Sequence, residues 1–338
     1  MSKNVFIIAE ISANHGNDIE IVKDTMKKAK EIGADAVKIQ TYTADTITLD
    51  TNSEDFIIRD GSIWNGRNLH DLYKEGSLPF EWHQELFDFA RENNIVLFST
   101  PFDNSAVDLL EEVGNPIYKI ASFEANDVPL IKYCASKNKP MIISTGIATE
   151  DEIERAVKAC IDTGNTDITL LKCTSQYPAQ ISDANMEMMN YFKEKFNVKV
   201  GLSDHTIGST VPIVATALGA EVIEKHFILD REIGGPDASF SMTPEEFGQM
   251  VKDVRDASNS LGEVSFELTE KKKKSRTFRR SLYISNDVSK GDIVSDENIK
   301  SVRPGYGLNP LHYEEVIGMK FKGDFKKGDR LSLDKLEE

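Results

Sequence analysis

Polar residues that could do chemistry recur along the first two thirds of the chain, each at or just after the end of a short apolar run. Carboxylates occupy three of these positions, at Glu10, Glu124 and Glu224, and imidazoles occupy two, at His205 and His226. Cations, hydroxyls and an amide fill the others, at Lys38, Gln40, Thr100, Lys119, Ser122, Ser144, Lys172, Ser175 and Ser203. Packing does not account for so regular a series, which therefore predicts one active site.

The two imidazoles suggest a metal site. Two histidines on neighbouring strand ends could bind one divalent cation, with water or substrate completing the coordination shell. Mn²⁺, Mg²⁺ and Co²⁺ all suit such an open site. One core histidine and one hydrogen-bonded histidine would fit the same spacing, so both interpretations of His205 and His226 stand. A further histidine, His83, is predicted to lie on a helix surface.

The cations and acids suggest the rest of the chemistry. Lysines and serine hydroxyls are suited to binding a phosphate and a carboxylate. The three glutamates could serve sugar hydroxyls, a metal or proton transfer. A metal, an anion site and several acids together predict condensation or cleavage at a carbonyl, with a phosphorylated small molecule as one substrate.

Eight apolar runs, separated by segments with helical periodicity, would position these residues. Each run is bounded by polar or small residues, as buried parallel strands are. The runs are 5–9, 36–39, 95–99, 117–120, 141–144, 168–171, 198–202 and 222–223. Eight strands alternating with helices over about 250 residues predict a (β/α)8 TIM barrel over residues 1–262, with its active site at the C-terminal ends of the strands. A doubly wound sheet is the alternative, weakened because no G-x-G-x-x-G follows any run.

An unusually long connection follows Gln40. Nearly 40 residues separate it from the helix predicted near Pro79, and they include GSIWNGRNLHDLY at 61–73. Connections of this length are usually functional lids or binding loops. A surface excursion packed by its own Trp64 and Tyr73 is the alternative.

The last part of the chain has a different character. Residues 263–280, which include KKKKSR, are typical of a solvated linker, and 281–338 are predicted to form a small, mostly β domain. Two segments there, 287–299 and 324–336, share the pattern D-x-x-K-G-D. Between them, RPGYGL places Arg303 in a turn that could present it to an anion. A surface turn with an unengaged arginine fits equally well.

Composition excludes several classes of protein. The chain has 40 basic and 56 acidic residues and a net charge of −16, which argues against binding nucleic acid. No apolar stretch is long enough for a membrane span, and the N-terminus does not have the pattern of a signal peptide. The three cysteines, Cys134, Cys160 and Cys173, lie in apolar runs. Buried reduced thiols in a cytoplasmic protein are therefore expected.

Short sequence strings spread along the chain carry a resemblance to a known family. In order, they are IAEISANHG, VKIQTY, STPFD, YKIASFE, STGIA, LKCTSQYP, GLSDHT and EKHF. They resemble the sialic acid synthase family, and the segment from SLYISNDVSKGD to RPGYGL resembles its C-terminal antifreeze-like (SAF) domain. The resemblance implies a TIM-barrel enzyme that condenses phosphoenolpyruvate with an amino sugar, giving a nonulosonic acid and phosphate. It also implies a domain-swapped homodimer, in which the SAF domain of one subunit closes over the barrel of the other.

The same resemblance implies roles for individual residues. His205 and His226 match the divalent-metal ligands, and Glu10, Glu124 and Glu224 match acidic residues around the reacting centre. Matches to the phosphoenolpyruvate site are Lys38, Thr100, Lys119, Ser122, Ser144, Ser175 and Ser203. Gln40 and Asp237 fall where contacts to the acceptor sugar are expected, and Arg303 matches the arginine that reaches the partner's site. Ser175 departs from the asparagine usual in sialic acid synthases proper.

Within the family, ISANHG, FIIRDGSIWNGRNLHDLYKE, KIASFEAND and CTSQYP are similar to the pseudaminic acid synthase branch. The implied acceptor is 2,4-diacetamido-2,4,6-trideoxy-L-altrose, and the implied use of the product is flagellin or surface-glycan modification. An N-acetylneuraminate or legionaminate synthase would differ only in its acceptor. A barrel that condenses phosphoenolpyruvate with an aldose phosphate is disfavoured because such enzymes lack the SAF tail. A non-catalytic sugar- or ice-binding protein is the alternative from a different class.

Overall fold

The protein is represented by a computed structural model that describes residues 5–59, 61 and 64–338. The chain divides into two compact units, one ending at Gly262 and the other beginning at Glu263.

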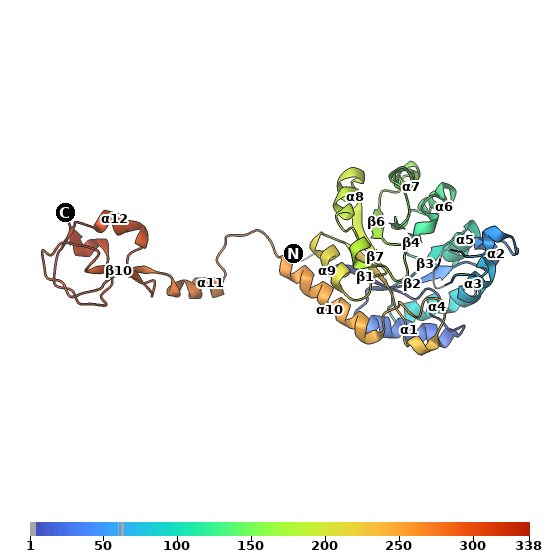
Figure 1. The fold of residues 1–338 in the computed structure, drawn as a ribbon, viewed down its shortest axis with the longest axis horizontal. Coiled ribbons are helices and arrows are strands. Elements are labelled where there is room, and N and C mark those ends of the chain that lie inside the picture. The colour runs from blue at the N-terminus through green and yellow to red at the C-terminus, as the bar shows by residue number, and fades with distance from the viewer. Residues whose placement is uncertain (1–4, 60, 62–63) are drawn as a thin grey trace. The chain divides into compact units, whose positions relative to one another are not determined.

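Within the described residues, eight parallel strands close into a barrel in the order of the sequence (Figure 1). They are β1 (Phe6–Glu10), β2 (Ala36–Thr41), β3 (Leu97–Pro101), β4 (Tyr118–Ile120), β5 (Met141–Ser144), β6 (Ile168–Cys173), β7 (Lys199–Asp204) and β8 (Val222–His226). The barrel closes where β1 pairs with β8, which brings Glu10 into register with His226. The predicted TIM barrel is confirmed, and the doubly wound sheet is excluded because β1 and β8 leave no open edge.

Helices surround the strands. The main ones are α1 (Ile19–Glu31), α4 (Trp82–Glu92), α5 (Asn104–Val113), α6 (Val128–Ala135), α7 (Glu150–Asp162), α8 (Met188–Phe196), α9 (Thr210–Ala217) and α10 (Pro244–Leu261). Local sequence fixes where several of them begin. Thr149 and Glu152 form a capping box that starts α7, and Thr243 and Glu246 do the same for α10, which has proline at its first position.

The strands alternate between two faces, and this alternation creates the site. One inward-facing layer of apolar residues fills the barrel, made of Ile8, Ala36, Phe98, Ile142, Leu171 and Val222. Two residues further along each of these strands lie Glu10, Lys38, Thr100, Ser144, Cys173 and Glu224, which face the same way because side chains repeat with a period of two. The C-terminal end of the barrel therefore carries a polar layer on an apolar floor.

The long connection after β2 has structure of its own and also reaches the C-terminal end of the barrel. It contains α2 (Ala44–Ile47), a 3-10 turn (Glu54–Phe56) and α3 (Leu69–Gly76). Trp64 lies 5.6 Å from the ring of Tyr177, and its indole N–H donates to the carbonyl of Pro236 at 3.3 Å. Asp60, Ser62 and Ile63 of this predicted lid lie outside the described residues.

The second unit, all of which is described, contains two small antiparallel sheets. One pairs β9 (Ser281–Ile284) with β10 (Ile299–Val302), and the other pairs β11 (Lys320–Phe321) with β12 (Leu336–Glu337). A short helix, α12 (Tyr313–Val316), precedes β11. The segment predicted as a linker is partly helical, with α11 (Glu270–Ser275) followed by a 3-10 turn.

The repeated D-x-x-K-G-D pattern forms the same turn twice. The carboxylate of Asp292 accepts from the backbone N–H of Ser289 at 2.7 Å, and Asp329 accepts from Lys326 at 2.9 Å. The glycine before each aspartate has a positive φ, +90° and +97°, which favours glycine. The repeated sequence pattern therefore corresponds to a repeated turn in the structure. Among the helices of the described residues, none combines the length and apolar character needed to cross a membrane.

Gly201 of β7 offers a test of how tightly the barrel is packed. A methyl group at this position would lie 2.4 Å from the carbonyl oxygen of Val222 on the neighbouring strand and 2.7 Å from Leu171. We expect Gly201→Ala to destabilise the protein by about 1–3 kcal/mol, since neither the backbone nor the barrel floor can yield freely. Urea unfolding of both proteins measures the difference.

Gly248 of α10 is the matched control. A methyl group there would meet Ile32 at an ordinary contact distance of 3.7 Å. Gly248→Ala should stabilise the helix by about 0.5–1 kcal/mol. If the two substitutions changed the free energy of unfolding equally, the tight packing around Gly201 would be contradicted.

Candidate active site

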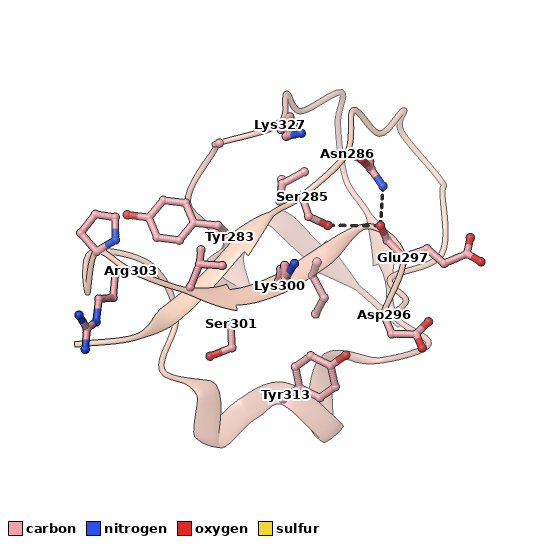
Figure 2. Close-up of a pocket in the computed structure, with 15 residues that line it drawn as sticks. Tyr283, Ser285, Asn286, Asp296, Glu297, Lys300, Ser301, Arg303, Tyr313 and Lys327 are labelled. Atoms are coloured by element: carbon pink, nitrogen blue, oxygen red, sulfur yellow. Dashed lines mark hydrogen bonds between the residues drawn. The ribbon is translucent and has the colours of Figure 1, made fainter. Parts of the chain in front are cut away.

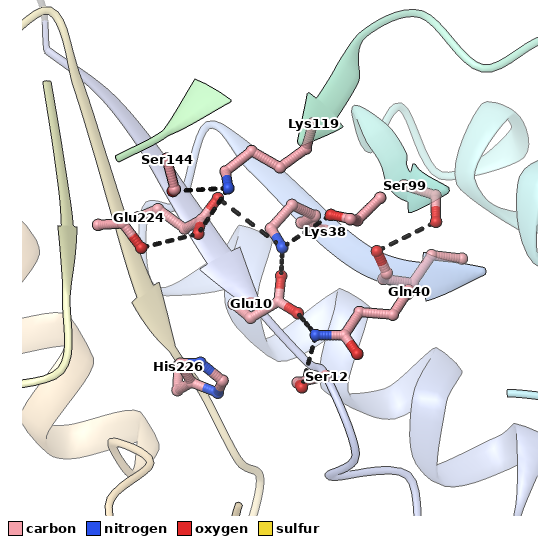
Figure 3. Close-up of polar contacts among 12 residues, drawn as sticks. Glu10, Ser12, Lys38, Gln40, Ser99, Lys119, Ser144, Glu224 and His226 are labelled. Atoms are coloured by element: carbon pink, nitrogen blue, oxygen red, sulfur yellow. Dashed lines mark hydrogen bonds and ion pairs between the residues drawn. The ribbon is translucent and has the colours of Figure 1, made fainter. Parts of the chain in front are cut away.

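Two lysines and two glutamates meet at the C-terminal end of the barrel (Figure 3). Lys38 Nζ lies 2.5 Å from Glu10 Oε2 and 3.8 Å from Glu224 Oε2, and Lys119 Nζ lies 3.8 Å from Glu224 Oε1. All four residues are at most 6% exposed. Burying four charges carries a large desolvation penalty, which mutual pairing reduces only where the geometry is good. The sequence predicted all four residues, and the structure brings them together.

Burial and pairing set different protonation states for the two glutamates. Burial, together with the nearby Glu224, raises the pKa of Glu10 to about 7, although Lys38 opposes this shift. Burial would also raise the pKa of Glu224, but the ammonium groups of Lys119 and Lys38 outweigh it and lower that pKa. At neutral pH, Glu224 is therefore the fixed anion, and Glu10 can take up or release a proton.

Hydroxyl and amide groups surround the cluster. Lys38 donates to Thr100 Oγ1 at 3.2 Å, and Lys119 donates to Ser144 Oγ at 2.7 Å. Ser203 Oγ donates to Glu224 at 3.1 Å. Gln40 Nε2 donates to Glu10 Oε1 at 3.3 Å and to Ser12 Oγ at 2.9 Å. The predicted hydroxyl and amide residues of four strands, β2, β3, β5 and β7, therefore form one network with the charged groups.

Ser122 and Ser175 form a separate hydroxyl pair. Their Oγ atoms lie 2.6 Å apart. Gly146 lies against them, because a methyl group at this glycine would come within 2.1 Å of Ser175 Oγ and 3.1 Å of Ser122 Oγ. Because Gly146 has no side chain, an anion could approach closely and receive hydrogen bonds from these hydroxyl groups.

Glu124 lies near Lys119 at the edge of this region. Its Oε2 atom is buried and has no hydrogen-bond partner among the described residues. Burial raises the pKa of Glu124 to about 7, against the opposing charge of Lys119. An unsatisfied buried carboxyl oxygen that can carry a proton near neutrality is suited to proton transfer.

The two predicted metal-binding histidines lie close together. The ring centres of His205 and His226 are 5.2 Å apart. Nδ1 of His205 lies 2.7 Å from the carbonyl oxygen of Thr174, which orients this ring and leaves Nε2 for another partner. Nδ1 of His226 is buried and has no hydrogen-bond partner among the described residues, and Asp237 Oδ2 lies 3.8 Å from it.

This arrangement fits a divalent cation. Burial, followed by the neighbouring His205, lowers the pKa of His226 well below its usual value, so this ring is a neutral imidazole as metal binding requires. Across the described ranges, no three histidine, cysteine or acidic side chains converge as a complete metal site. The two imidazoles would therefore need water or substrate to complete the shell of a bound cation.

Aromatic rings cover the imidazoles. Tyr177 lies 4.4 Å from the ring of His205, and Phe240 lies 5.1 Å from that of His226. The ring of Trp64, from the long connection, lies 5.6 Å from that of Tyr177. These three aromatic residues were not singled out as site residues from the sequence, because nothing in their local pattern distinguishes them from core aromatics.

Of two neighbouring positions on β6, Lys172 was assigned to the wrong face and Cys173 was assigned to none. Lys172, predicted at the site, faces the helices, donates to the carbonyl of Cys173 at 2.8 Å and lines a cavity of about 200 Å³ near Tyr191. Cys173, predicted only as a buried thiol, faces the site instead, with Sγ 3.9 Å from both His205 Nδ1 and Ser175 Oγ. The alternation of β6, in phase with the inward-facing Leu171, identifies Cys173 as the inward residue.

The prediction for His83 was wrong. It is fully buried in α4, with Nε2 2.8 Å from Thr41 Oγ1 and Nδ1 3.1 Å from the carbonyl oxygen of Pro79. Burial lowers its pKa to about 4. It is a neutral structural histidine that joins α4 to the outer face of β2.

Arg303 belongs to the second unit, where it is exposed at the end of β10. Figure 2 shows a groove of about 830 Å³ in this unit, with Arg303 toward one end. Tyr283, Lys300, Tyr313 and Lys327 also line it. Asp296 and Glu297 line it too, so Arg303 lies on an accessible surface of mixed charge in the second unit.

Comparisons with known proteins agree with both units. The NeuB family profile matches residues 25–266, and the SAF domain profile matches residues 279–337. A pseudaminic acid synthase from Campylobacter jejuni is 49% identical, over 97% of this chain and 96% of its own. One from Helicobacter pylori is 46% identical, over 98% and 97%. The crystal structure of an N-acetylneuraminic acid synthetase from Leptospira borgpetersenii is 31% identical with a TM-score of 0.72, over 81% of this chain and 90% of that one.

The raised pKa of Glu124 has a consequence for stability. Because its pKa is higher in the folded state than the ordinary value of 4.5, its ionisation opposes folding. Stability is therefore lost as the pH rises from 4.5 to about 7, and the loss levels off above that pH. We expect Glu124→Gln to be about 2–3 kcal/mol more stable than the wild type at pH 8. Urea unfolding at several pH values should show this difference shrinking toward pH 5.

Glu112→Gln, at an exposed position of α5, is the control and should change stability little at any pH. A Glu124→Gln variant whose advantage does not depend on pH would contradict the assignment of a buried, proton-binding carboxyl.

Proposed function

The chain belongs to the NeuB family, and on this premise we propose that it is a pseudaminic acid synthase, which condenses phosphoenolpyruvate with 2,4-diacetamido-2,4,6-trideoxy-L-altrose to give pseudaminic acid and phosphate. The observation that carries the proposal is the similarity to pseudaminic acid synthases, 49% and 46% identity over nearly the whole chain. Identity to the N-acetylneuraminic acid synthetase is only 31%.

The lysines and hydroxyls supply the site for phosphoenolpyruvate. Its phosphate and carboxylate carry several negative charges, and a protein with a net charge of −16 must neutralise them locally. Lys38 and Lys119 are the buried cations of the barrel mouth, and Lys119 already holds Ser144. Ser122 and Ser175 add hydroxyl groups at close range.

The reaction makes one carbon–carbon bond and breaks one carbon–oxygen bond. C3 of phosphoenolpyruvate attacks the aldehyde carbon of the open-chain sugar, and the aldehyde oxygen takes up a proton. Water adds at C2 and gives up one proton. The C2–O bond to phosphate then breaks as the C2 hydroxyl becomes the keto group, and its proton leaves with the phosphate. Glu124, with a pKa of about 7, would donate the first proton and accept the second, whereas Glu224 stays ionised between the lysines.

His205 and His226 would hold a divalent cation, Mn²⁺, Mg²⁺ or Co²⁺, and the unsatisfied buried Nδ1 of His226 supports this. When bound, the cation would act as a Lewis acid that polarises the acceptor's carbonyl oxygen. Asp237 lies beside His226, and Gln40 lies beside Glu10. At these positions both side chains could contact hydroxyl groups of the acceptor. Tyr177, with Trp64 packed against it, would exclude water from the reacting atoms.

The choice of acceptor is tested by phosphate release from phosphoenolpyruvate with Mn²⁺. The acceptors are the altrose derivative, N-acetylmannosamine and the legionaminic acid precursor. We expect kcat/KM to be at least about 100-fold higher with the altrose derivative. Preference for another sugar would contradict the proposed acceptor but keep the condensation chemistry, and no release with any acceptor would favour the non-catalytic alternative.

A homodimer is proposed to complete the site. Its support is apolar surface around the barrel mouth, where Phe123, Ile147 and Ile207 are 56–75% exposed on connections that follow β4, β5 and β7. Phe266, near the start of the second unit, is 97% exposed. Contiguous apolar patches mark protein–protein contacts, and we take these side chains to belong to such a patch. In a domain-swapped dimer, the partner's SAF domain would cover the mouth, and Arg303 of the partner subunit would add a cation for the substrate's phosphate.

Complementation between two inactive variants tests this arrangement. His226→Ala and Arg303→Ala homodimers should each lose at least about 99% of activity, because each site lacks a ligand or a cation. Co-expressed in equal amounts, they should recover about a quarter of the wild-type sites, since each mixed dimer contains one intact site. Mixed dimers that form but stay inactive would contradict the swap, as would a monomer in sedimentation.

The cell compartment and the use of the product follow from the same proposal. We place the enzyme in the cytoplasm, supported by Cys134, Cys160 and Cys173, which are all free and buried. Its product would then serve the modification of flagellin or another surface glycan.

A further inference from the structure

A second buried ion pair lies behind the two imidazoles, on the helix-facing side of the barrel wall. Lys225 Nζ contacts Asp204 Oδ2 directly, and their side chains are 2% and 1% exposed. Each residue immediately precedes a histidine of the candidate metal site, and the two are paired in register across β7 and β8. Neighbouring residues on a strand face opposite ways, so the pair lies outside the site and touches no substrate.

The pair also organises the segment that follows β7. Lys225 Nζ donates to the carbonyl oxygens of Thr206 at 2.5 Å and Gly208 at 3.1 Å. Asp204 Oδ1 accepts from the backbone N–H of Thr206 at 3.0 Å and from its hydroxyl at 2.8 Å. The three protons of the ammonium group are therefore all used, and they tie residues 204–208 to β8. His205 lies within this tied segment.

Stability alone does not account for such a pair. Replacing a buried ion pair by apolar or neutral residues of similar size is often neutral or stabilising, because the desolvation penalty disappears. A neutral pair would not, however, supply the contacts by which the Lys225 ammonium group joins the end of β8 to the end of β7. Those ends carry the two rings whose separation decides whether one cation can contact both.

We propose that Lys225 and Asp204 are positioning residues that fix His205 relative to His226, so that the two imidazoles hold one divalent cation. The inference rests on the proposed function, which assigns a metal to these histidines. The ion pair acts through the backbone of β7 and β8. Replacing both residues by neutral ones should therefore weaken metal binding without a matching loss of stability.

The experiment measures Mn²⁺ binding to the full-length protein by isothermal titration calorimetry, together with the thermal midpoint of unfolding. Lys225→Met should weaken Mn²⁺ binding by about 10–100-fold, the usual effect of losing a group that orients metal ligands. It should also lower the midpoint, because Asp204 is left buried and unpaired. The double variant Asp204→Asn/Lys225→Met should recover most of the midpoint while its Mn²⁺ affinity stays at least about 10-fold weakened.

An ion pair at the other end of the barrel is the control. Arg255 Nη2 lies 2.6 Å from Asp35 Oδ2, which also accepts from the backbone N–H of Ile7 at 2.8 Å. Arg255→Met should lower the midpoint and leave Mn²⁺ affinity within about twofold of the wild type.

The outcomes separate the two proposals. A double variant that is stable and binds Mn²⁺ as the wild type does would overturn the positioning role and leave the proposed function intact. The positioning role would also be overturned if Arg255→Met weakened binding as much as the double variant does. A wild-type protein that binds no Mn²⁺ would overturn the metal assignment and this inference with it.

Discussion

The buried ion pairs of Glu10, Lys38, Lys119 and Glu224 are the interaction on which the rest of the structure depends. Four charges removed from water are tolerable only if each is held within reach of its counter-ions. A closed barrel meets this requirement, because every strand is hydrogen-bonded on both sides and its inward residues cannot drift apart. The apolar floor keeps water out from below. Serine, threonine and glutamine side chains hydrogen-bond to each of the four charged groups, although Oε2 of Glu10 and of Glu224 has no hydrogen-bond partner among the described residues.

The outer faces of the same strands carry a second set of polar contacts. There, Thr41 contacts both Ser99 at 2.6 Å and His83 at 2.8 Å, and Lys225 contacts Asp204. These groups face the helices and touch no part of the candidate site. A strand in this barrel therefore carries two sets of polar residues, one for chemistry and one that fixes the strand against its neighbours and the helices. Distinguishing them requires the phase of the strand as well as the residue type.

This distinction explains how far the sequence could be interpreted. All eight strands, the capping boxes and the lysine–glutamate cluster were predictable, because apolar runs and strand ends are local signals. Lys172 was placed at the site by its distance from a run, because the two-residue alternation was not applied. Cys173 was correctly predicted as a buried thiol, but its face was not predicted for the same reason. His83 was misplaced because a polar residue on an amphipathic helix is usually exposed, and its partner Thr41 lies 42 residues away. The aromatic cover over the imidazoles depends on contacts between distant loops, which no local pattern carries.

The protein's own carboxylates already occupy the cations that an anionic ligand would need. Lys38 is held by Glu10, and Lys119 lies beside Glu224. An anion that binds here would replace a glutamate as the counter-ion of a lysine. Its affinity would therefore depend on how much more strongly the lysine interacts with the anion than with the glutamate. Because the pKa of Glu10 is about 7, a carboxylate displaced from its lysine gains a proton more readily. Binding of an anion at this site would thereby be linked to proton uptake, and its apparent affinity would depend on the pH of the surrounding solution.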